Sequence, residues 1–334
     1  MKNGNNTKAK LISIVAPVFN EEPSIAEFYR RLDDVISNLN YSFEIIFVDD
    51  GSRDKSLQVL REIIQKDNRV KFLSFSRNFG HQIAITAGMK NAQGDAVIVM
   101  DGDLQHPPEL IPRLITKWEE GFEIVSTIRK DVKNIRLFKK MTAALFYKLI
   151  NRISDTEVKE NAADFRLLDR KVVNTFKRLN ERGMFVRGLV GWLGYNQTHV
   201  EFVADVRFAG ETKYSVTKMI KFALDGIMAF SSFPLRVATH LGVLAILVPL
   251  PYTLWAVYAR LFTEQAVPGW ASILVAIIFL GGVQLITIGI IGQYIARIYD
   301  EVKGRPLYIV KEMNGFDHGL YDSSTGNDSS PVEI

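Results

Sequence analysis

Two long stretches in the C-terminal third of the chain lack any charged residue, and they constrain the fold more than any other feature. Residues 237–259 run for 23 positions without Asp, Glu, Lys or Arg, and residues 265–296 run for 32. A helix needs about 20 apolar residues to cross a bilayer, and uncharged core helices of this length are rare in soluble domains. The sequence therefore predicts two transmembrane helices, at 233–260 and 270–297.

The charges beside these stretches predict their orientation. Arg236 precedes the first stretch, and Arg297, Lys303 and Arg305 follow the second. Basic flanks stay on the cytoplasmic side, so both termini are expected inside, at the plasma (inner) membrane, with a short loop outside. The polar first ten residues do not resemble a signal peptide. A net charge of +4 gives no case for nucleic acid, and the absence of cysteine fits a reducing compartment.

The residues before these stretches alternate between short apolar runs and segments with helical periodicity. Helical periodicity is clear at 23–39 and at 52–67, where Ser52 is expected to cap the helix. Such alternation indicates a mainly parallel sheet with helices on both faces. The expected strands are 11–19, 43–50, 70–76, 96–103 and 122–128.

Polar side chains follow each expected strand at its carboxyl end, which is the edge where open α/β sheets bind ligands. Aspartate and glycine are also good turn formers, so one such cluster could be only a turn. The repetition at five strand ends favours a binding site. The residues are Asn20 and Glu22, Asp50 and Ser52, Arg77, Asp101 and Asp103, and finally Arg129 with Lys130.

The motif content indicates which cofactor such a site would hold. No G-x-G-x-x-G follows the first strand and no Walker A motif is present, so a dinucleotide is not expected. Substrate phosphates would instead be neutralised by a cation and by basic side chains. Carboxylate and amide oxygens are hard ligands that suit Mg²⁺ or Mn²⁺.

Six motifs occur in a fixed order: VAPVFNEE, FVDDGSRD, SRNFGHQIAITAG, VMDGDLQHPPE, DFRLLDR and RFAGETKYS. Together they resemble the inverting family 2 glycosyltransferases, and more narrowly the polyprenyl-phosphate sugar transferases related to dolichol-phosphate mannose synthase. The closest resemblance is to the bacterial two-span branch that loads glucose from UDP-glucose onto undecaprenyl phosphate. It covers nearly all of residues 11–310, including the paired spans.

The resemblance implies an α/β GT-A fold, which is Rossmann-like with a mainly parallel sheet, and a role for each motif residue. It implies a metal at Asp101, Asp103 and Gln105, with Asp103, Asp164, Arg166 and Lys213 at the reacting centre. A UDP-sugar donor would contact Pro17, Asn20, Glu22, Asp50, Ser52, Arg77, Asp101 and Arg207, and the acceptor phosphate would contact Arg129, Arg136 and Lys140. By themselves, Asp164 and Arg166 could be a buried structural ion pair, and Lys213 a solvated loop lysine. His81 and His106 could be metal ligands, but neither has a second histidine at metal-binding spacing. Both are expected to be structural or to support the metal ligands without binding the metal.

Two amphipathic segments separate the catalytic residues from the spans. One lies near 135–153 and has a basic face, and the other covers 215–232. Such helices commonly pack on a protein's own core, but a basic face beside membrane spans favours the headgroup layer. The expected organisation is a cytoplasmic catalytic domain at 1–214, an interfacial helix at 215–232, the two spans, and a cytoplasmic segment at 298–334 that is disordered at its end.

The expected chemistry is a single displacement at the anomeric carbon of the donor sugar. A phosphate monoester has a second pKa of about 6 and is mostly dianionic at neutral pH, so this acceptor needs no general base. Asp164 is therefore expected to orient the substrates or to stabilise positive charge on the anomeric carbon.

Three alternatives stay open at this point. The donor could be GDP-mannose, as in dolichol-phosphate mannose synthase. A processive polysaccharide synthase shares the catalytic domain, but usually carries a Q-x-x-R-W motif, which residues 181–195 lack. A membrane-anchored binding protein with an inactive transferase domain is disfavoured by the acids at 50, 101 and 103. The expected partners are a polyprenyl phosphate in the bilayer, a homo-oligomer through the spans, and a separate downstream flippase.

Overall fold

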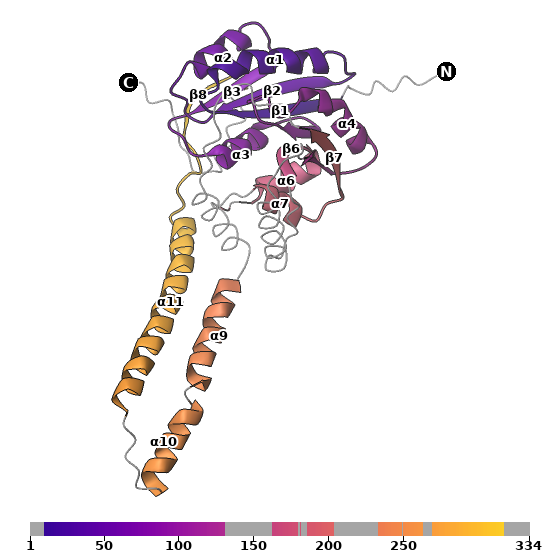
Figure 1. Cartoon of the computed structure of the whole chain (residues 1–334). Helices are drawn as coiled ribbons and strands as arrows, with labels where there is room; N and C mark the ends of the chain where they lie inside the picture. Colours follow the sequence, from indigo (N-terminus) through magenta and orange to yellow (C-terminus); the bar gives the residue numbers. More distant parts are fainter. Residues whose placement is uncertain are drawn as a thin grey trace. The chain divides into compact units, whose positions relative to one another are not determined.

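The computed structural model describes residues 10–130, 162–179, 181, 186–203, 233–248, 250–262 and 269–316 (Figure 1). The chain forms two compact units. One contains Met1–Asn151, Thr156–Tyr214 and Arg305–Ile334, and the other contains Arg152–Asp155 and Ser215–Gly304. Several predictions lie outside the described residues, namely both interfacial helices, Arg136, Lys140, Arg207 and Lys213.

The first unit is built on an eight-stranded sheet in the order β7-β5-β6-β4-β1-β2-β3-β8. Strands β1, β2, β3 and β4 pair in parallel, as do β5 and β7, whereas β6 is antiparallel to both of its neighbours. The five expected strands and the mainly parallel sheet are confirmed. The strands are β1 (Leu11–Val18), β2 (Ser42–Asp49), β3 (Val70–Phe75), β4 (Ala96–Val99), β5 (Ile124–Lys130), β6 (Ala162–Asp169), β7 (Gln197–Val203) and β8 (Val310–Asn314).

Helices cover both faces of this sheet, as the alternation of elements predicts (Figure 1). Alternate residues of β1, such as Ile12 and Ile14, join one buried cluster with the apolar faces of α1, α2 and α4. On the other face α3 lies so close to β1 that a Cβ on Gly88 would be 2.2 Å from Val15 Cγ1. The helices are α1 (Glu22–Ile36), α2 (Ser56–Ile64), α3 (His81–Asn91), the short η1 (Pro108–Leu110), α4 (Ile111–Glu119), α6 (Arg170–Lys177) and α7 (Val186–Trp192).

Two local predictions are wrong. The N-cap of α2 is Lys55, because the hydroxyl of Ser52 instead accepts the backbone N–H of Asn20. Arg129 and Lys130 do not follow β5 but are its last two residues, since both continue the parallel pairing with β7.

The chain returns to the sheet after the helical unit, which the sequence analysis did not predict. β8 pairs antiparallel with the edge strand β3. Its approach is fixed by Tyr308, whose ring stacks on Phe75 with 4.9 Å between ring centroids, and Glu312 forms an ion pair with Arg61. β8 therefore covers an edge that would otherwise expose unpaired backbone groups.

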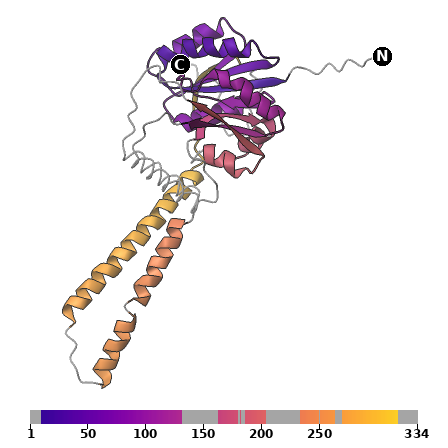
Figure 2. The ribbon, with the colours of Figure 1, turned by 45° about the vertical axis from the view of Figure 1, so that its right-hand side comes forward.

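The second unit consists of α9 (Phe233–Leu247), α10 (Leu250–Phe262) and α11 (Trp270–Val302), with α9 beside α11 (Figures 1 and 2). Among the described residues one helix is long and apolar enough to cross a membrane, over Ala276–Val302, and none of that segment is buried. The expected first span is divided into α9 and α10, each too short to cross alone. Pro251 lies in the first turn of α10, where proline is tolerated.

A tight backbone approach holds together the loops that follow β2 and β3. Gly51 has φ +71°, and a Cβ at this position would be 2.5 Å from the carbonyl carbon of Arg77. Only glycine leaves room for the two loops to meet here. Gly121 also has a positive φ, +97°, but a Cβ there would have no neighbour within 4 Å.

This difference predicts unequal costs for two identical substitutions. Gly121→Ala should destabilise the protein by about 1 kcal/mol, from backbone strain alone. Gly51→Ala adds a backbone clash and should cost about 3 kcal/mol. Thermal unfolding of the detergent-solubilised full chain would measure both. Equal losses would contradict the close approach of the two loops.

Candidate active site

The polar residues predicted to form a site lie at one edge of the sheet. The carboxyl ends of β1 to β4 share this edge because these strands are parallel. β6 runs the opposite way, so its beginning reaches the same edge and brings Asp164 there. The antiparallel strand thus explains how residues from the second half of the domain join those from the first.

Asp101 follows β4 and is fixed by His106. The backbone N–H of Asp101 donates to Nδ1 of His106 at 3.0 Å. His106 is buried and stacks on Phe165, with 5.4 Å between ring centroids. His106 therefore shapes the loop after β4, and its Nδ1 is not available as a metal ligand.

The rest of this loop has an unusual backbone conformation. Leu104 has φ +65° although its side chain is buried, a conformation that costs an ordinary residue on the order of 1 kcal/mol. On either side of it, Asp103 and Gln105 turn toward each other. The Gln105 side-chain amide donates to Asp103 Oδ2 at 2.8 Å, and its backbone N–H donates to Oδ1 at 3.1 Å.

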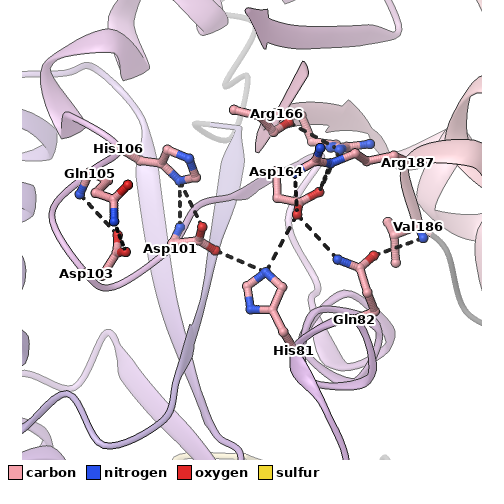
Figure 3. A network of polar contacts seen from close by, with 11 residues as sticks. His81, Gln82, Asp101, Asp103, Gln105, His106, Asp164, Arg166, Val186 and Arg187 are labelled. Carbon is pink, nitrogen blue, oxygen red and sulfur yellow. Dashed lines mark hydrogen bonds and ion pairs between the residues drawn. The ribbon is translucent and has the colours of Figure 1, made fainter. Parts of the chain in front are cut away.

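Asp164 is the centre of the largest polar network at this edge (Figure 3). Arg187, from α7, donates from Nε and Nη2 to its two oxygens at 2.8 and 2.9 Å. Arg166, on the same strand, donates to Oδ1 at 3.0 Å. Gln82, from α3, donates to Oδ2 at 3.3 Å. Three separate elements thus hold one carboxylate.

These contacts determine the ionisation of the network. Burial alone would raise the pKa of Asp164, but the nearby His81 imidazole, the hydrogen bonds from Arg187 and the charges of both arginines hold that pKa well below its usual range. Burial lowers the pKa of Arg166 to about 10, against the opposing charge of Asp164. At neutral pH the site therefore contains an ionised carboxylate surrounded by cationic groups.

His81 joins this network to Asp101. Its Nε2 lies 3.3 Å from Asp101 Oδ1 and 3.7 Å from Asp164 Oδ2 (Figure 3). Burial lowers the pKa of His81, but the adjacent carboxylates of Asp164 and Asp101 outweigh this effect, and the net pKa is raised. The imidazole thus lies between the loop after β4 and the start of β6.

Three of the predicted donor-binding residues connect the loops that follow β1 and β2. Ser52 accepts the backbone N–H of Asn20 at 2.9 Å, and Asn20 Oδ1 accepts the N–H of Arg53 at 2.8 Å. Glu22 accepts the N–H of Lys55 at 3.2 Å. Asn20 has φ +56°, which asparagine tolerates better than most residues. The two loops are therefore one rigid wall of the edge.

Asp50 anchors the loop before α3. Its carboxylate accepts the N–H of Phe79 at 2.7 Å and that of Gly80 at 2.9 Å. Burial, as the largest effect, raises the pKa of Asp50 despite these bonds. Arg77 lies in the same loop, with its guanidinium 4.1 Å from the ring centroid of Phe79, and Pro17 is a buried residue of β1.

The donor set after β4 fits a divalent cation. Asp101 and Asp103 supply hard oxygens, and among the described residues Asp101 Oδ1 is a buried oxygen that accepts no hydrogen bond and lies 3.3 Å from His81 Nε2. In the part of the chain that the structure describes, no group of three His, Cys, Asp or Glu residues forms a closed metal site. Magnesium sites often use only one or two carboxylates and leave the remaining positions to water and substrate phosphates.

The structure thus brings together most of the predicted residues and adds two that were not singled out from the sequence, Gln82 and Arg187. Asp101, Asp103, Gln105, Asp164 and Arg166 share one edge, and Arg129 is an exposed residue of β5. His81 contacts the predicted metal ligand Asp101, which agrees with the expectation that it is structural or supports a metal ligand. In the sequence Arg187 is a basic residue in the first turn of a short apolar helix. This pattern is too common in proteins to indicate a functional residue.

Comparisons with known proteins agree with the motifs. Residues 13–176 match the glycosyl transferase family 2 model. The uncharacterized glycosyltransferase YkcC of Bacillus subtilis is 50% identical over 92% of this chain and 95% of its own length. The SfII prophage-derived bactoprenol glucosyl transferase of Shigella flexneri is 45% identical over 90% of this chain and 97% of its own.

Solved structures are more distant. Glucosyl-3-phosphoglycerate synthase from Mycobacterium tuberculosis, solved with Mn²⁺, UDP and its product, is 17% identical over 66% of this chain and 78% of its own, with a TM-score of 0.42. A likeness this low says nothing about the chemistry of this chain.

The buried network predicts a pH-dependent cost for Asp164→Asn. The substitution leaves Arg166 buried with an uncompensated charge, and breaking such a pair costs about 3–5 kcal/mol. Because the folded pKa of Asp164 lies below its ordinary value of 3.8, the carboxylate stabilises the fold fully above about pH 5, and this stabilisation is lost as the pH falls below 4. The stability difference between parent and variant should therefore shrink below pH 4, and it should also become smaller as the pH rises through the pKa of His81, which the Asp164 carboxylate helps to raise.

Unfolding of the full chain in detergent at a series of pH values would measure this difference. Asp34→Asn is the matched control, because Asp34 forms an exposed pair with Arg30 and its loss should cost less than about 1 kcal/mol. A variant at Asp164 as stable as the parent at pH 7 would contradict the network.

Proposed function

The chain belongs to glycosyl transferase family 2, and we propose that it transfers glucose from UDP-glucose to the phosphate of a membrane polyprenyl phosphate, with inversion at the anomeric carbon. The observation that carries this proposal is the 45% identity to a bactoprenol glucosyl transferase, which extends over nine-tenths of both chains. Similarity of this extent includes most of the helical unit, and not the catalytic domain alone. The product is a lipid-linked sugar for later use in glycan modification.

The reaction is one displacement. A phosphate oxygen of the lipid attacks the anomeric carbon of glucose, and the bond from that carbon to the UDP oxygen breaks with its electron pair on UDP. An α-linked donor therefore yields a β-linked product. Since the acceptor phosphate is mostly dianionic at neutral pH, it attacks without first losing a proton to the protein.

The ionisation of Asp164 supports this role. A carboxylate whose pKa is held well below its usual range is a poor general base, because a base works best with a pKa near the working pH. In the proposal Asp164 stays ionised and orients the sugar and acceptor, or stabilises positive charge on the anomeric carbon. Arg166 and Arg187 hold it in place through the bonds already described.

The remaining residues are assigned by chemistry. Asp101, Asp103 and Gln105 would hold Mg²⁺ or Mn²⁺, which would neutralise charge on the donor diphosphate. Lys213 and Arg207 would contact the leaving UDP. Arg129, Arg136 and Lys140 would bind the acceptor phosphate, while Pro17, Asn20, Glu22, Asp50, Ser52 and Arg77 would line the donor site.

The proposed acceptor requires the protein to be membrane-associated, and the exposed apolar segment Ala276–Val302 is consistent with this. We further propose that α9 and α10 together form a first span and α11 a second, with the catalytic unit inside the cell. The proposed domain organisation is a catalytic domain, an interfacial helix, two spans and a C-terminal segment, at 1–214, 215–232, 233–260, 270–297 and 298–334. Within the last segment, β8 pairs with β3 of the catalytic sheet. Association through the spans and a separate flippase complete the scheme.

A transfer assay tests the function directly. Membranes containing the full chain would be given polyprenyl phosphate and one radiolabelled nucleotide sugar at a time. UDP-glucose should place label in the organic phase, as a β-linked monosaccharide on the lipid phosphate. Label from GDP-mannose would favour the mannose alternative, label in a non-extractable polymer would favour a processive synthase, and no transfer from any donor would favour a binding protein.

Asp103→Asn should reduce turnover by about a hundredfold or more, because the loss of a charge-stabilising contact usually costs this much. The change is nearly isosteric and keeps an oxygen for the backbone N–H of Gln105. Asp95→Asn is the matched control, since Asp95 precedes the same strand at the opposite edge and its carboxylate accepts the N–H of Leu11, a bond that the amide oxygen of Asn can also accept. Activity of the Asp103 variant within threefold of the parent, or full activity in EDTA, would contradict the metal assignment.

The proposed topology predicts the labelling of single cysteines in this cysteine-free chain. A cysteine replacing Thr263, between the proposed spans, should react with a membrane-impermeant thiol reagent in intact cells. One replacing Ser323, near the C-terminus, should react only after the cells are opened. The reverse pattern would separate the active site from its cytoplasmic donor and contradict the scheme.

A further inference from the structure

Gln82 contacts two elements of the site at once. It lies half-buried in the first turn of α3. Its Nε2 donates to Asp164 Oδ2 at 3.3 Å, and its Oε1 accepts the backbone N–H of Val186 at 3.0 Å (Figure 3). One side-chain amide therefore connects the carboxylate on β6 with the beginning of α7.

This connection fixes both partners of the ion pair between Arg187 and Asp164. Val186 is the first residue of α7, where a backbone N–H has no partner within the helix, and Arg187 follows it directly. The Oε1 contact therefore sets the backbone from which Arg187 extends. The Nε2 contact sets the carboxylate that Arg187 reaches.

Gln82 is itself tied to the predicted donor site. The two residues before α3, Phe79 and Gly80, donate their backbone N–H groups to Asp50. The hydroxyl of Thr86 donates to the backbone carbonyl of Gln82 at 2.8 Å. The start of α3 is thus fixed relative to the loop after β2, and Gln82 extends that constraint to Asp164.

We propose that Gln82 is a positioning residue, which holds Asp164 and Arg187 in register with the donor-binding loop without touching substrate. A side-chain amide can donate to a carboxylate and accept from an N–H at the same time. Glutamate lacks the donor, and methionine has nearly the same length but makes neither bond. Only the kinetic part of this inference rests on the proposed function.

The kinetic test compares Gln82→Met with the parent. The expected result is a fall in kcat of roughly 10- to 100-fold, because small misplacements of reacting groups cost this much. KM for UDP-glucose should stay within about twofold, since the donor-contacting residues are unchanged. Gln82→Glu should be at least as slow, because it places a second carboxylate beside Asp164. Gln58→Met is the matched control, on the exposed face of α2, and should keep full activity.

A second set of variants tests whether Gln82 acts through Arg187. Arg187→Lys keeps the charge but removes the two-pronged contact. If Gln82 acts through Arg187, the double variant Gln82→Met/Arg187→Lys should have a kcat less than about twofold below that of Arg187→Lys alone. An equal reduction in both backgrounds would overturn the proposal. A Gln82→Met variant that is less stable than the parent but has the parent's kcat would also overturn the proposal, because the role of Gln82 would then be structural only.

Hydrogen exchange tests the bridge without relying on sugar transfer. In Gln82→Met the amide of Val186 should exchange roughly fivefold faster. The amide of Leu193, which donates to Leu189 at the end of α7, should exchange at the parent's rate. Unchanged exchange at Val186 would overturn the proposal. If Val186 exchanges faster in Gln82→Met but the parent protein does not use UDP-glucose, only the proposed donor is rejected. The kinetic comparison would then use the nucleotide sugar that the parent turns over.

Discussion

The architecture of the site depends on keeping one carboxylate ionised while it is almost fully buried. Moving an unpaired charge out of water costs several kcal/mol, which only well-placed partners offset. Asp164 has such partners from β6, α3 and α7, in Arg166, Gln82 and Arg187. Each element must therefore be in place for the others to be stable. The same requirement explains why β6 runs against its neighbours, since only that direction brings its first residues to the edge where β4 ends.

The loops after β1, β2 and β3 form another part of this edge, and hydrogen bonds between side chains and backbone groups hold them together. Asn20, Ser52 and Asp50 accept or donate hydrogen bonds within the loops after β1, β2 and β3, and Gly51 lets two of these loops meet. The positive φ at Asn20 is tolerated inside this framework. A wall fixed in this way needs little rearrangement when a nucleotide binds, which lowers the cost of ordering the donor.

The sequence was sufficient to predict what depends on local pattern. The first five strands, the edge where they end and the acids Asp101, Asp103 and Asp164 all follow from short-range signals and motifs. An apolar run carries no sign of its direction, so the antiparallel course of β6 was not predicted. Gln82 and Arg187 join Asp164 through long-range side-chain contacts that no spacing reveals. The division of the first apolar stretch into α9 and α10 was not predicted, although Pro251 lies in the first turn of α10.

The buried anion and the proposed acceptor fit each other chemically. An acceptor hydroxyl would require a base with a pKa near neutrality, and the cationic partners of Asp164 move its pKa the other way. A lipid phosphate brings its own negative charge and needs cations around it instead of a base. Arg187 is about one-third exposed while it holds Asp164, so it presents positive charge toward solvent from the same place. For a dianionic acceptor, the arginines that prevent Asp164 from acting as a base are therefore an advantage.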